Sequence, residues 1–374
     1  MNISQNKKRG SRMKRFINCH VPVTACNLRC PYCYVTQNKW WSKELPKFQY
    51  SPEHIGKALT QKRLGGVCHF NMCGMGETLL PPEMPDIIKE ILKNGHTVMV
   101  ITNGTLTKRF QEICKFPREL LERLCFKFSL QYVELKRLHL MDKFFENVRM
   151  VKKAGCSFSV ELTPHDEIID EIPNIKELCM KELGAYCHVT VGRRDDQPGV
   201  PILTNLSREE YYNTWKTFKS EMFEFKMSTF NVKRCEFCYA GAWSLLLDLG
   251  TGEAKQCYET FTKQNIFKNL KKPIKFEAVG NNCCSAHCHN SHAFLTLGLI
   301  PELDTPPYEK MRNRKTVSGE EWLNETMKNN LSERLYDSNQ EYSSFKKKYI
   351  NFKNRCEIKA YSVYKFVKKK LRNK

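Results

Sequence analysis

Strand-like and helix-like segments alternate between about residue 15 and residue 220, and this alternation restricts the folds open to the chain. Each strand-like segment is short, apolar-rich and bounded by turn or charged residues. The six segments are 15–23, 66–74, 96–104, 125–133, 156–164 and 187–193. Helix-like segments lie between them, at 51–66, 81–95, 108–124, 141–155 and 173–184. Six such units predict a parallel sheet with helices outside, either open or a partial barrel, with the active site at the carboxyl ends of the strands.

Charge and the ends of the chain limit the function further. The 374 residues carry a formal net charge of +21, much of it in 7–15 and 345–374. A strongly basic chain suggests a nucleic-acid or anionic-membrane partner, although basic ends are commonly just solvated. The opening residues lack the apolar core of a signal peptide, and no stretch approaches the roughly 20 apolar residues of a membrane span. We therefore expect a cytoplasmic protein.

The cysteines form two groups and a scatter. Such a number would suit a secreted disulfide framework, but those chains are usually short. The first group is Cys26, Cys30 and Cys33; the second comprises Cys235, Cys238, Cys257, Cys283, Cys284 and Cys288. In a reducing compartment grouped thiols are more often metal ligands than disulfides. The scattered cysteines are expected to pack as small buried hydrophobic side chains.

Three close thiolates are one short of a structural zinc site, which takes four protein ligands. Only Cys19 lies near the first group in the sequence, on a different segment. Thiolates are also the usual ligands of a cubane iron–sulfur cluster. Three of them leave one of its four irons open, and an open iron can hold a substrate or a cofactor.

The first group resembles the signature of the radical S-adenosylmethionine enzymes. The signature is C-x3-C-x2-C with an aromatic residue before the last cysteine, here Cys26, Cys30, Tyr32 and Cys33, just after the first strand. The resemblance implies a partial six-unit barrel and a 4Fe-4S cluster whose open iron binds S-adenosylmethionine. It also implies reductive cleavage of that cofactor to a 5′-deoxyadenosyl radical, which abstracts hydrogen from a substrate.

Further residues take cofactor roles through this resemblance. GMGET, 74–78, is similar to the Gly-Gly-Glu motif that receives the methionine ammonium, with Gly74, Gly76 and Glu77 kept and Met75 in place of a glycine. A carboxylate such as that of Glu77 can bind an ammonium group, and glycines allow the backbone to approach a ligand closely. The alternative is that Glu77 only stabilises the start of the next helix. The other implied cofactor contacts are Tyr32, Asn103, Ser129, Gln131 and Arg193. Arg193 would bind the cofactor's carboxylate or a substrate anion, unless it is an ordinary surface arginine.

The second group is similar to the auxiliary-cluster domain called SPASM, or twitch in its shorter form. Cys238-x13-Gly252-x4-Cys257 matches its opening, and a hairpin is predicted at 243–257. The full form binds two clusters through a longer cysteine run that this chain lacks, so we expect one auxiliary 4Fe-4S cluster. Cys238, Cys257 and Cys288 with one of Cys283 or Cys284 are the expected ligands, and Cys235 could replace any of them. Zinc is the alternative metal, since thiolates alone also suit it.

The resemblance predicts the chemistry better than the substrate. Relatives with an auxiliary cluster act on peptides or on small carbohydrates, so the expected substrate is one of these, with flavodoxin or ferredoxin as electron donor. Only about 25 residues precede Cys26, which weakens the peptide option. Glu161, His188 and Arg193 are weak candidates for an acid or base. The alternative function is a non-catalytic zinc-binding or nucleic-acid adaptor protein.

The predicted organisation has three parts. Residues 1–225 form the radical S-adenosylmethionine barrel, 226–300 the auxiliary-cluster domain and 301–374 a helical, basic extension. The extension contains one plausible helix within 318–337 and a basic tail with Ile358, Tyr361, Tyr364, Val367 and Leu371 at helical spacing. Such a tail could lie on an anionic membrane at its cytoplasmic face, bind RNA, or pack on the barrel with its charges in water.

Overall fold

The computed structural model describes residues 12–372, with side chains described for 12–361. Part of the basic stretch 7–15 and the side chains of Tyr364, Val367 and Leu371 therefore lie outside the described residues.

Within residues 12–372, one sheet of nine strands organises the fold, in the order β6-β5-β4-β3-β2-β1-β7-β8-β9. Its strands are β1 Arg15–Val21, β2 Cys68–Gly74, β3 Thr97–Thr102, β4 Leu124–Ser129, β5 Ser157–Leu162, β6 His188–Val189, β7 Ser244–Asp248, β8 Glu253–Lys255 and β9 Lys263–Asn265. Strands β1 to β6 pair in parallel. The predicted α/β fold with a parallel sheet is confirmed.

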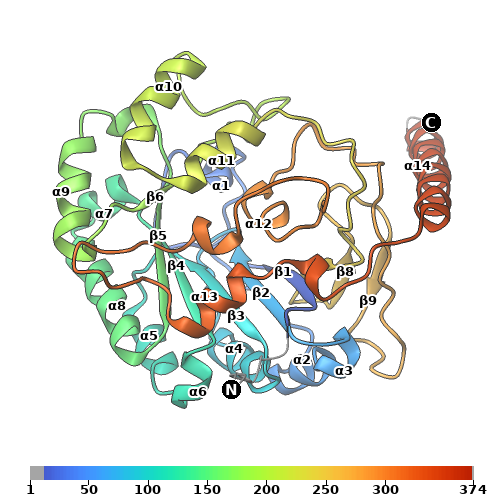
Figure 1. The fold of residues 1–374 in the computed structure, drawn as a ribbon, viewed down its shortest axis with the longest axis horizontal. Helices are drawn as coiled ribbons and strands as arrows, with labels where there is room; N and C mark the ends of the chain where they lie inside the picture. Colours follow the sequence, from blue (N-terminus) through green and yellow to red (C-terminus); the bar gives the residue numbers. More distant parts are fainter. Residues whose placement is uncertain (1–11, 373–374) are drawn as a thin grey trace, which may run out of the picture.

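Helices cover the outer face of the parallel strands, in an arc that Figure 1 shows from α2 to α9. They are α2 Pro52–Ala58, α3 Gln61–Leu64, α4 Met84–Lys93, α5 Thr107–Ile113, α6 Arg118–Leu121, α7 Tyr132–Arg137, α8 Met141–Ala154 and α9 Ile172–Leu183. The short helix α1 Tyr34–Gln37 directly follows Cys33 and lies outside this arc. Side chains alternate across a strand, and Val98 and Val100 accordingly pack outward with the helices. Because both faces of the sheet are covered, the strands read as nearly continuous apolar runs.

The inner face is covered by the second half of the chain, which lies in front of the strands in Figure 1. Its helices are α10 Arg208–Trp215, α11 Glu221–Thr229, α12 Ser291–Phe294, α13 Glu325–Ser332 and α14 Ser344–Arg372. Short 3-10 turns add η1 Asp166–Ile168, η2 Lys216–Phe218, η3 Tyr308–Met311 and η4 Leu335–Asp337. Phe16, Met99 and Cys125 face inward and pack with Phe294 and Tyr308.

Residues 308–339 run across the amino ends of the strands. The Phe158 amide donates to the Trp322 carbonyl at 3.1 Å, and the Thr97 hydroxyl donates to Asn330 at 2.9 Å. The Asn324 amide donates to the Ser157 hydroxyl at 2.9 Å. This segment therefore closes the inner face at the end opposite the cysteine loop.

The helix predicted within 318–337 is limited to α13, Glu325–Ser332. Gly319 takes a φ of +88°, and Trp322 and Leu323 are buried before the helix begins. Tertiary packing of the Trp322 ring, which stacks on Phe158, overrides the helical preference of this stretch. The extension is thus largely irregular between residues 301 and 343.

The hairpin predicted at 243–257 is present as β7 and β8, which pair antiparallel. It does not stand apart from the first six strands, because β7 pairs in parallel with β1 over Phe16 to His20. The expected boundary at residue 225 also falls inside α11. Residues 226–300 therefore continue the main sheet.

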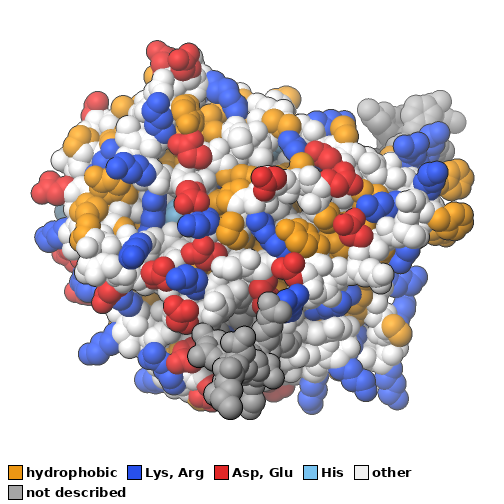
Figure 2. Space-filling model, in the orientation of Figure 1, with side chains coloured by type: hydrophobic (Ala, Val, Ile, Leu, Met, Phe, Trp, Pro, Cys, Tyr) orange, Lys and Arg blue, Asp and Glu red, His pale blue; other side chains and the backbone are white. Residues whose placement is uncertain are grey.

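The tail forms a helix as expected, α14 over 29 residues, which projects at the right of Figure 1. One side packs on the cysteine-rich region, where Asn354 donates to the carbonyls of Ala278 and Val279 at 3.0 and 2.9 Å. Phe345, Tyr349 and Phe352 are exposed on α14. Figure 2 shows hydrophobic and basic side chains gathered there. Within residues 12–372, no helix is long and apolar enough to cross a bilayer.

Candidate active site between two cysteine groups

The first cysteine group lies on the loop that leaves the carboxyl end of β1. The loop begins against the GMGET segment after β2: the Gly76 amide donates to the Val23 carbonyl at 2.7 Å, and the Glu77 amide donates to the Ala25 carbonyl at 3.0 Å. These bonds extend the β1–β2 pairing past the strand ends. They fix the position at which Cys26 enters the loop.

Gly76 is required by this backbone contact. A Cβ atom at this position would lie 2.0 Å from the Ala25 carbonyl oxygen, far inside van der Waals contact. A Cβ at Gly74 would lie 2.6 Å from the side chain of Val23. The close approach expected here is present, and it joins the motif to the cysteine loop.

The three thiols of the first cysteine group lie on this loop and influence one another electrostatically. Burial first, then Cys33 and Cys26, raises the pKa of Cys30 well above its ordinary value. Burial and Glu77 raise the pKa of Cys26 to about 11. The Cys26 sulfur receives the Leu28 amide at 3.4 Å and the Asn103 amide nitrogen at 3.6 Å. Neighbouring sulfurs with hydrogen-bond donors beside them form a donor set that suits an iron–sulfur cluster.

Glu77 is buried, and protein donors satisfy its carboxylate. The Thr102 hydroxyl, the Asn103 amide and the Leu79 amide donate to it at 2.7, 2.7 and 3.0 Å. Burial raises the pKa of Glu77 despite these three donors. The carboxylate lies beside Cys26, and its binding of a cofactor ammonium stays a prediction.

The remaining expected cofactor contacts lie around the same strand ends. The Tyr32 hydroxyl donates to the Gln131 side chain, and the Tyr32 ring stacks on His165 with centroids 4.3 Å apart. Ser129, at the end of β4, receives a hydrogen bond from Lys127 at 3.1 Å. Ser129 therefore belongs to the polar interior, whereas Gln131, just before α7, contacts Tyr32 of the cysteine loop.

Four thiols of the second cysteine group influence one another electrostatically. Burial first, then Cys238, Cys288 and Cys283, raises the pKa of Cys257 well above its ordinary value. Cys238 and Cys283 likewise raise the pKa of Cys288 after burial. This set, one cysteine from the bridge near Gly280, one from the hairpin and two from 283–288, suits the donor set of a 4Fe-4S cluster.

The two other cysteines of this group lie at the surface. Cys235 and Cys284 are exposed, whereas Cys238, Cys257, Cys283 and Cys288 are partly buried. Of the alternatives left open by the sequence, the geometry favours Cys283 over Cys284. Within residues 12–372, no three His, Cys, Asp or Glu side chains are grouped as ligands of a single metal ion.

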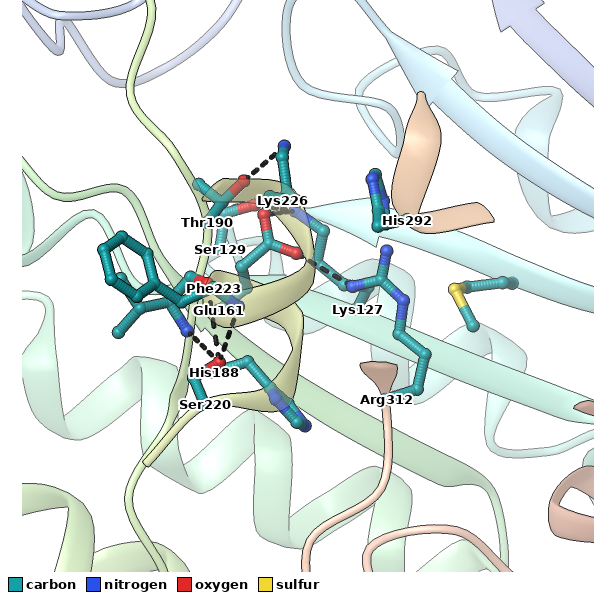
Figure 3. Close-up of polar contacts among 12 residues, drawn as sticks. Lys127, Ser129, Glu161, His188, Thr190, Ser220, Phe223, Lys226, His292 and Arg312 are labelled. Atoms are coloured by element: carbon teal, nitrogen blue, oxygen red, sulfur yellow. Dashed lines mark hydrogen bonds and ion pairs between the residues drawn. The ribbon is translucent and has the colours of Figure 1, made fainter. Parts of the chain in front are cut away.

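A buried ionic cluster lies on the inner face of the sheet (Figure 3). The Glu161 carboxylate, on β5, pairs with Lys127 of β4 at 3.2 Å and with Arg312 at 2.8 Å. Burial alone would raise the pKa of Glu161, but Lys127 and Arg312 outweigh it and hold the pKa well below its usual range. Glu161 is thus a permanently charged partner, which argues against a role as general acid or base.

His188 is buried beneath this cluster. Its Nε2 lies 3.1 Å from the Asn313 carbonyl, and its Nδ1 has no partner among the described residues. Burial first, then Arg314, lowers the pKa of His188 well below its ordinary value. It is a neutral imidazole packed against Trp322, distant in the fold from the cysteine loop.

Arg193 lies between the two cysteine groups. Its guanidinium pairs with Asp195 at 3.4 Å, and its carbonyl accepts from Gln37, one turn after Cys33. The same charge acts on Tyr34, next to Cys33, and on Tyr258, next to Cys257. Of the three candidate catalytic residues, it alone bridges the two groups.

Several residues near this site were not predicted from the sequence as site residues. They are Cys73, Lys127, Lys226, Tyr258 and Arg312. Tyr258 receives a hydrogen bond from Asn18 at 2.7 Å, and Asn18 receives one from Asn71 at 2.8 Å. Cys73 lies on β2 and Lys127 on β4. For these two residues, the available signal in the sequence was a polar side chain within an otherwise apolar strand. For Arg312 and Lys226 the sequence carries no such signal, because only the fold brings them inward.

Residues 21–179 match the Radical SAM superfamily. The matched segment begins at the last residue of β1 and contains the three-cysteine loop, the GMGET motif and strands β2 to β5. The similarity to this superfamily covers 159 of the 374 residues, less than half of the chain. The comparisons give no support to a zinc-binding or nucleic-acid adaptor.

Two curated relatives are named S-adenosyl-L-methionine-dependent tRNA 4-demethylwyosine synthase, from Pyrococcus horikoshii and Pyrococcus abyssi. Each is 28% identical over 115 residues, covering 25% of this chain and 34% of the relative, so the chain spans about a third of their length.

Among solved structures, Streptococcus suis SuiB bound to S-adenosylmethionine has a TM-score of 0.47 and 14% identity, over 69% of this chain and 64% of SuiB. anSMEcpe with bound AdoMet and a peptide has a TM-score of 0.45 and 14% identity, over 69% of this chain and 80% of its own.

Proposed function

We propose that this chain is a radical S-adenosylmethionine enzyme whose Cys26, Cys30 and Cys33 hold a 4Fe-4S cluster. The observation that carries the proposal is that three thiols on the loop after β1 influence one another electrostatically, inside the segment that matches the superfamily. When bound, the cluster and S-adenosylmethionine supply a 5′-deoxyadenosyl radical that abstracts hydrogen from the substrate.

The chain's own residues orient these groups. Gly76 and Glu77 fix the loop entrance through backbone bonds to Val23 and Ala25. Asn103 donates to the Cys26 sulfur, and such donors tune an iron–sulfur site. The acidic Glu77, next to this sulfur, is the proposed partner of the cofactor's ammonium.

The second cysteine group is the proposed ligand set of one auxiliary 4Fe-4S cluster. Cys238, Cys257, Cys283 and Cys288 are the four ligands, since their thiols influence one another and the two exposed cysteines do not join them. Four thiolates leave no open iron, which favours electron transfer over direct substrate binding. Residues 226–300 thereby act as an auxiliary-cluster domain built onto the main sheet.

Substrate and partners follow from the same proposal. The substrate is a peptide or a carbohydrate, reduction comes from flavodoxin or ferredoxin, and the reaction is an oxidation or cross-link. The protein works in the cytoplasm, and α14 brings it to the inner face of an anionic membrane. Basic and exposed aromatic side chains on α14 support this last point.

Iron analysis of the anaerobically purified full chain tests the proposal. About eight irons per chain are expected, with 5′-deoxyadenosine formed after dithionite and S-adenosylmethionine are added. Replacing Cys26, Cys30 and Cys33 together by Ala should leave about four irons and abolish cleavage. Cys284→Ser, at the exposed cysteine, is the matched control and should change neither quantity.

Two outcomes would contradict the proposal. Continued 5′-deoxyadenosine formation in the triple variant would mean that these thiols do not hold the reactive cluster. About two zinc ions and no iron would instead favour the adaptor alternative.

A further inference from the structure

The three thiols of the first cysteine group have different neighbours. Cys26 lies beside Glu77, since burial first and then this carboxylate raise the pKa of Cys26 to about 11. Cys33 is the N-cap of α1, from which the Gln37 side chain donates to the Arg193 carbonyl at 3.1 Å. Cys26 and Cys33 therefore lie on the side of the proposed cofactor site and of Arg193.

Cys30 lies where the cysteine loop reaches the surface. Its own side chain is buried, but Arg29 before it and Pro31 after it are exposed. The Arg29 amide donates to the Glu134 carboxylate of α7 at 2.8 Å, and the same carboxylate acts electrostatically on Cys30. The chain thus meets solvent one residue away from Cys30 on either side. An electron supplied from outside the protein can enter at this point.

A loop with two tryptophans adjoins Arg29. It comprises residues 38–47, directly after α1, and is named the tryptophan loop here. The central carbon of the Arg29 guanidinium lies 3.1 Å from the centre of the Trp41 ring. The side chains of Trp40 and Leu45 are 52% and 44% exposed. Aromatic and arginine side chains are enriched at protein interfaces, so this surface has the composition of a docking site.

Positive charge is in excess on this surface. The tryptophan loop carries Lys39, Lys43 and Lys47 against one carboxylate, Glu44, and all four side chains are exposed. With Arg29, four cations stand against one carboxylate. By contrast, the two cations of α7 are each paired with a carboxylate, in the pairs Lys136–Glu171 and Arg137–Glu134. The unbalanced charge beside Cys30 therefore lies on the tryptophan loop and suits an acidic partner.

We propose that Arg29 and the tryptophan loop form the docking surface for an acidic one-electron carrier protein of the flavodoxin or ferredoxin type. This inference rests on the proposed function, because a carrier is needed only if the first cysteine group holds a cluster. The carrier gives up one electron to that cluster, and no bond forms or breaks. Electron-transfer complexes are weak and have small interfaces, so a single loop beside one arginine is sufficient. Opposite charges on the two proteins speed their encounter.

Calorimetry with a flavodoxin and the anaerobically purified full chain tests the docking surface. In about 0.05 M salt, which screens surface charge weakly, one flavodoxin should bind per chain, and its affinity should fall as salt is added. Lys39→Gln combined with Lys43→Gln should weaken binding about fivefold or more, because two exposed cations are lost. Lys271→Gln combined with Lys272→Gln removes the same charge from another exposed basic stretch and should leave the affinity unchanged.

The choice of reductant separates docking from the reaction itself. With flavodoxin below saturation as the reductant, the variant of the tryptophan loop should form 5′-deoxyadenosine about fivefold more slowly than the unaltered protein. With dithionite, a small reductant that needs no docking surface, the two proteins should react alike. Absence of cleavage with dithionite in the unaltered protein would contradict the proposed function. Normal cleavage with dithionite but no binding of flavodoxin would overturn only this inference.

Three further results would overturn the inference. Equal weakening of flavodoxin binding by the two double variants would show that flavodoxin responds only to overall charge. Loss of dithionite-driven cleavage in the variant of the tryptophan loop would place this loop in the active site. Unchanged flavodoxin affinity, with weaker binding of the same variant to phosphatidylserine vesicles, would assign the loop to a membrane surface.

Discussion

At the level of single residues, Glu161 shows how the fold decides what a carboxylate can do. The sequence offered it as a weak acid or base candidate, because it is a polar residue near a strand end. In the structure Lys127 and Arg312 flank it on the inner face. Arg312 lies 151 positions further along the chain, so no local pattern could have predicted this pair.

Glu161→Gln should lower the unfolding free energy by about 3–5 kcal/mol, because it leaves two buried cations without their counter-charge. Since the pKa of Glu161 is lowered in the fold, its contribution is complete above the ordinary value near 4.3 and is lost as pH falls through the lowered value. Urea unfolding of the unaltered protein and of Glu161→Gln should be measured between about pH 3 and pH 8. The difference between their unfolding free energies should become smaller only on the acid side.

Glu122→Gln is the control, because its partner Arg118 is 64% exposed and surface pairs contribute about 0–1 kcal/mol. Equal losses of unfolding free energy in Glu161→Gln and Glu122→Gln would show that the ionic cluster around Glu161 is solvated.

Gly76→Ala should abolish cofactor cleavage, because its Cβ would overlap the Ala25 carbonyl and displace the cysteine loop. Gly199→Ala is the matched control: Gly199 has a positive φ of +79° but no atom within 4 Å of the added Cβ, so only about 1 kcal/mol of backbone strain is expected. The yield of 5′-deoxyadenosine per iron measures the effect. Normal cleavage by Gly76→Ala would contradict the role given to this contact.

At the level of elements, periodicity predicted most strands and helices of the first half, but it missed α1 and α7, and the strand predicted at 125–133 ends at Ser129. Each strand is apolar and short, and each neighbouring helix carries an apolar stripe, so local pattern and tertiary burial agree. The stretch 318–337 was predicted less well, because Trp322 packs on Phe158 before α13 begins. The tail was predicted as a helix, and α14 is one, but its contacts with Ala278 and Val279 left no trace in the sequence.

Replacing Phe345, Tyr349 and Phe352 together by Ser should weaken binding of the chain to anionic vesicles at least severalfold. These side chains are 83%, 58% and 70% exposed, and they stand among lysines on α14. Co-sedimentation with phosphatidylserine vesicles measures binding, with neutral vesicles alongside. Val317→Ser, which alters a side chain 80% exposed elsewhere, should have no effect. Unchanged binding by the triple variant would remove the membrane proposal.

At the level of the whole molecule, the sequence predicted three successive parts, whereas the structure interleaves them. Residues 308–339 lie against the first strands, and Tyr308, Met327 and Leu331 are fully buried in the inner core. Cysteine spacing could indicate chemistry because ligands must recur at short intervals. It could not indicate these long-range contacts, which depend on how the entire sheet is covered.

A chain ending at residue 300 should therefore lose cooperative unfolding, because the inner face of the sheet would be exposed. A chain ending at residue 343 keeps residues 308–339 and loses mainly the contacts of α14. It should still unfold in a single transition, at a modestly lower temperature. Scanning calorimetry compares the unfolding transitions of the two chains, and binding of a dye specific for apolar surface compares how much of that surface each exposes. If the chain ending at residue 300 unfolded cooperatively at the temperature of the full chain, residues 308–339 would not be needed to cover the inner face of the sheet.

The parallel pairing of β7 with β1 has a consequence for engineering. Module grafting exploits boundaries that few contacts cross. Here the hairpin leading to Cys257 shares a hydrogen-bonded ladder with the strand leading to Cys26, from Phe16 to His20. A chimera joined near residue 225 would split that ladder and leave two unpaired strand edges, which promote aggregation. The two cysteine groups should therefore be transplanted only together, as a single rigid unit.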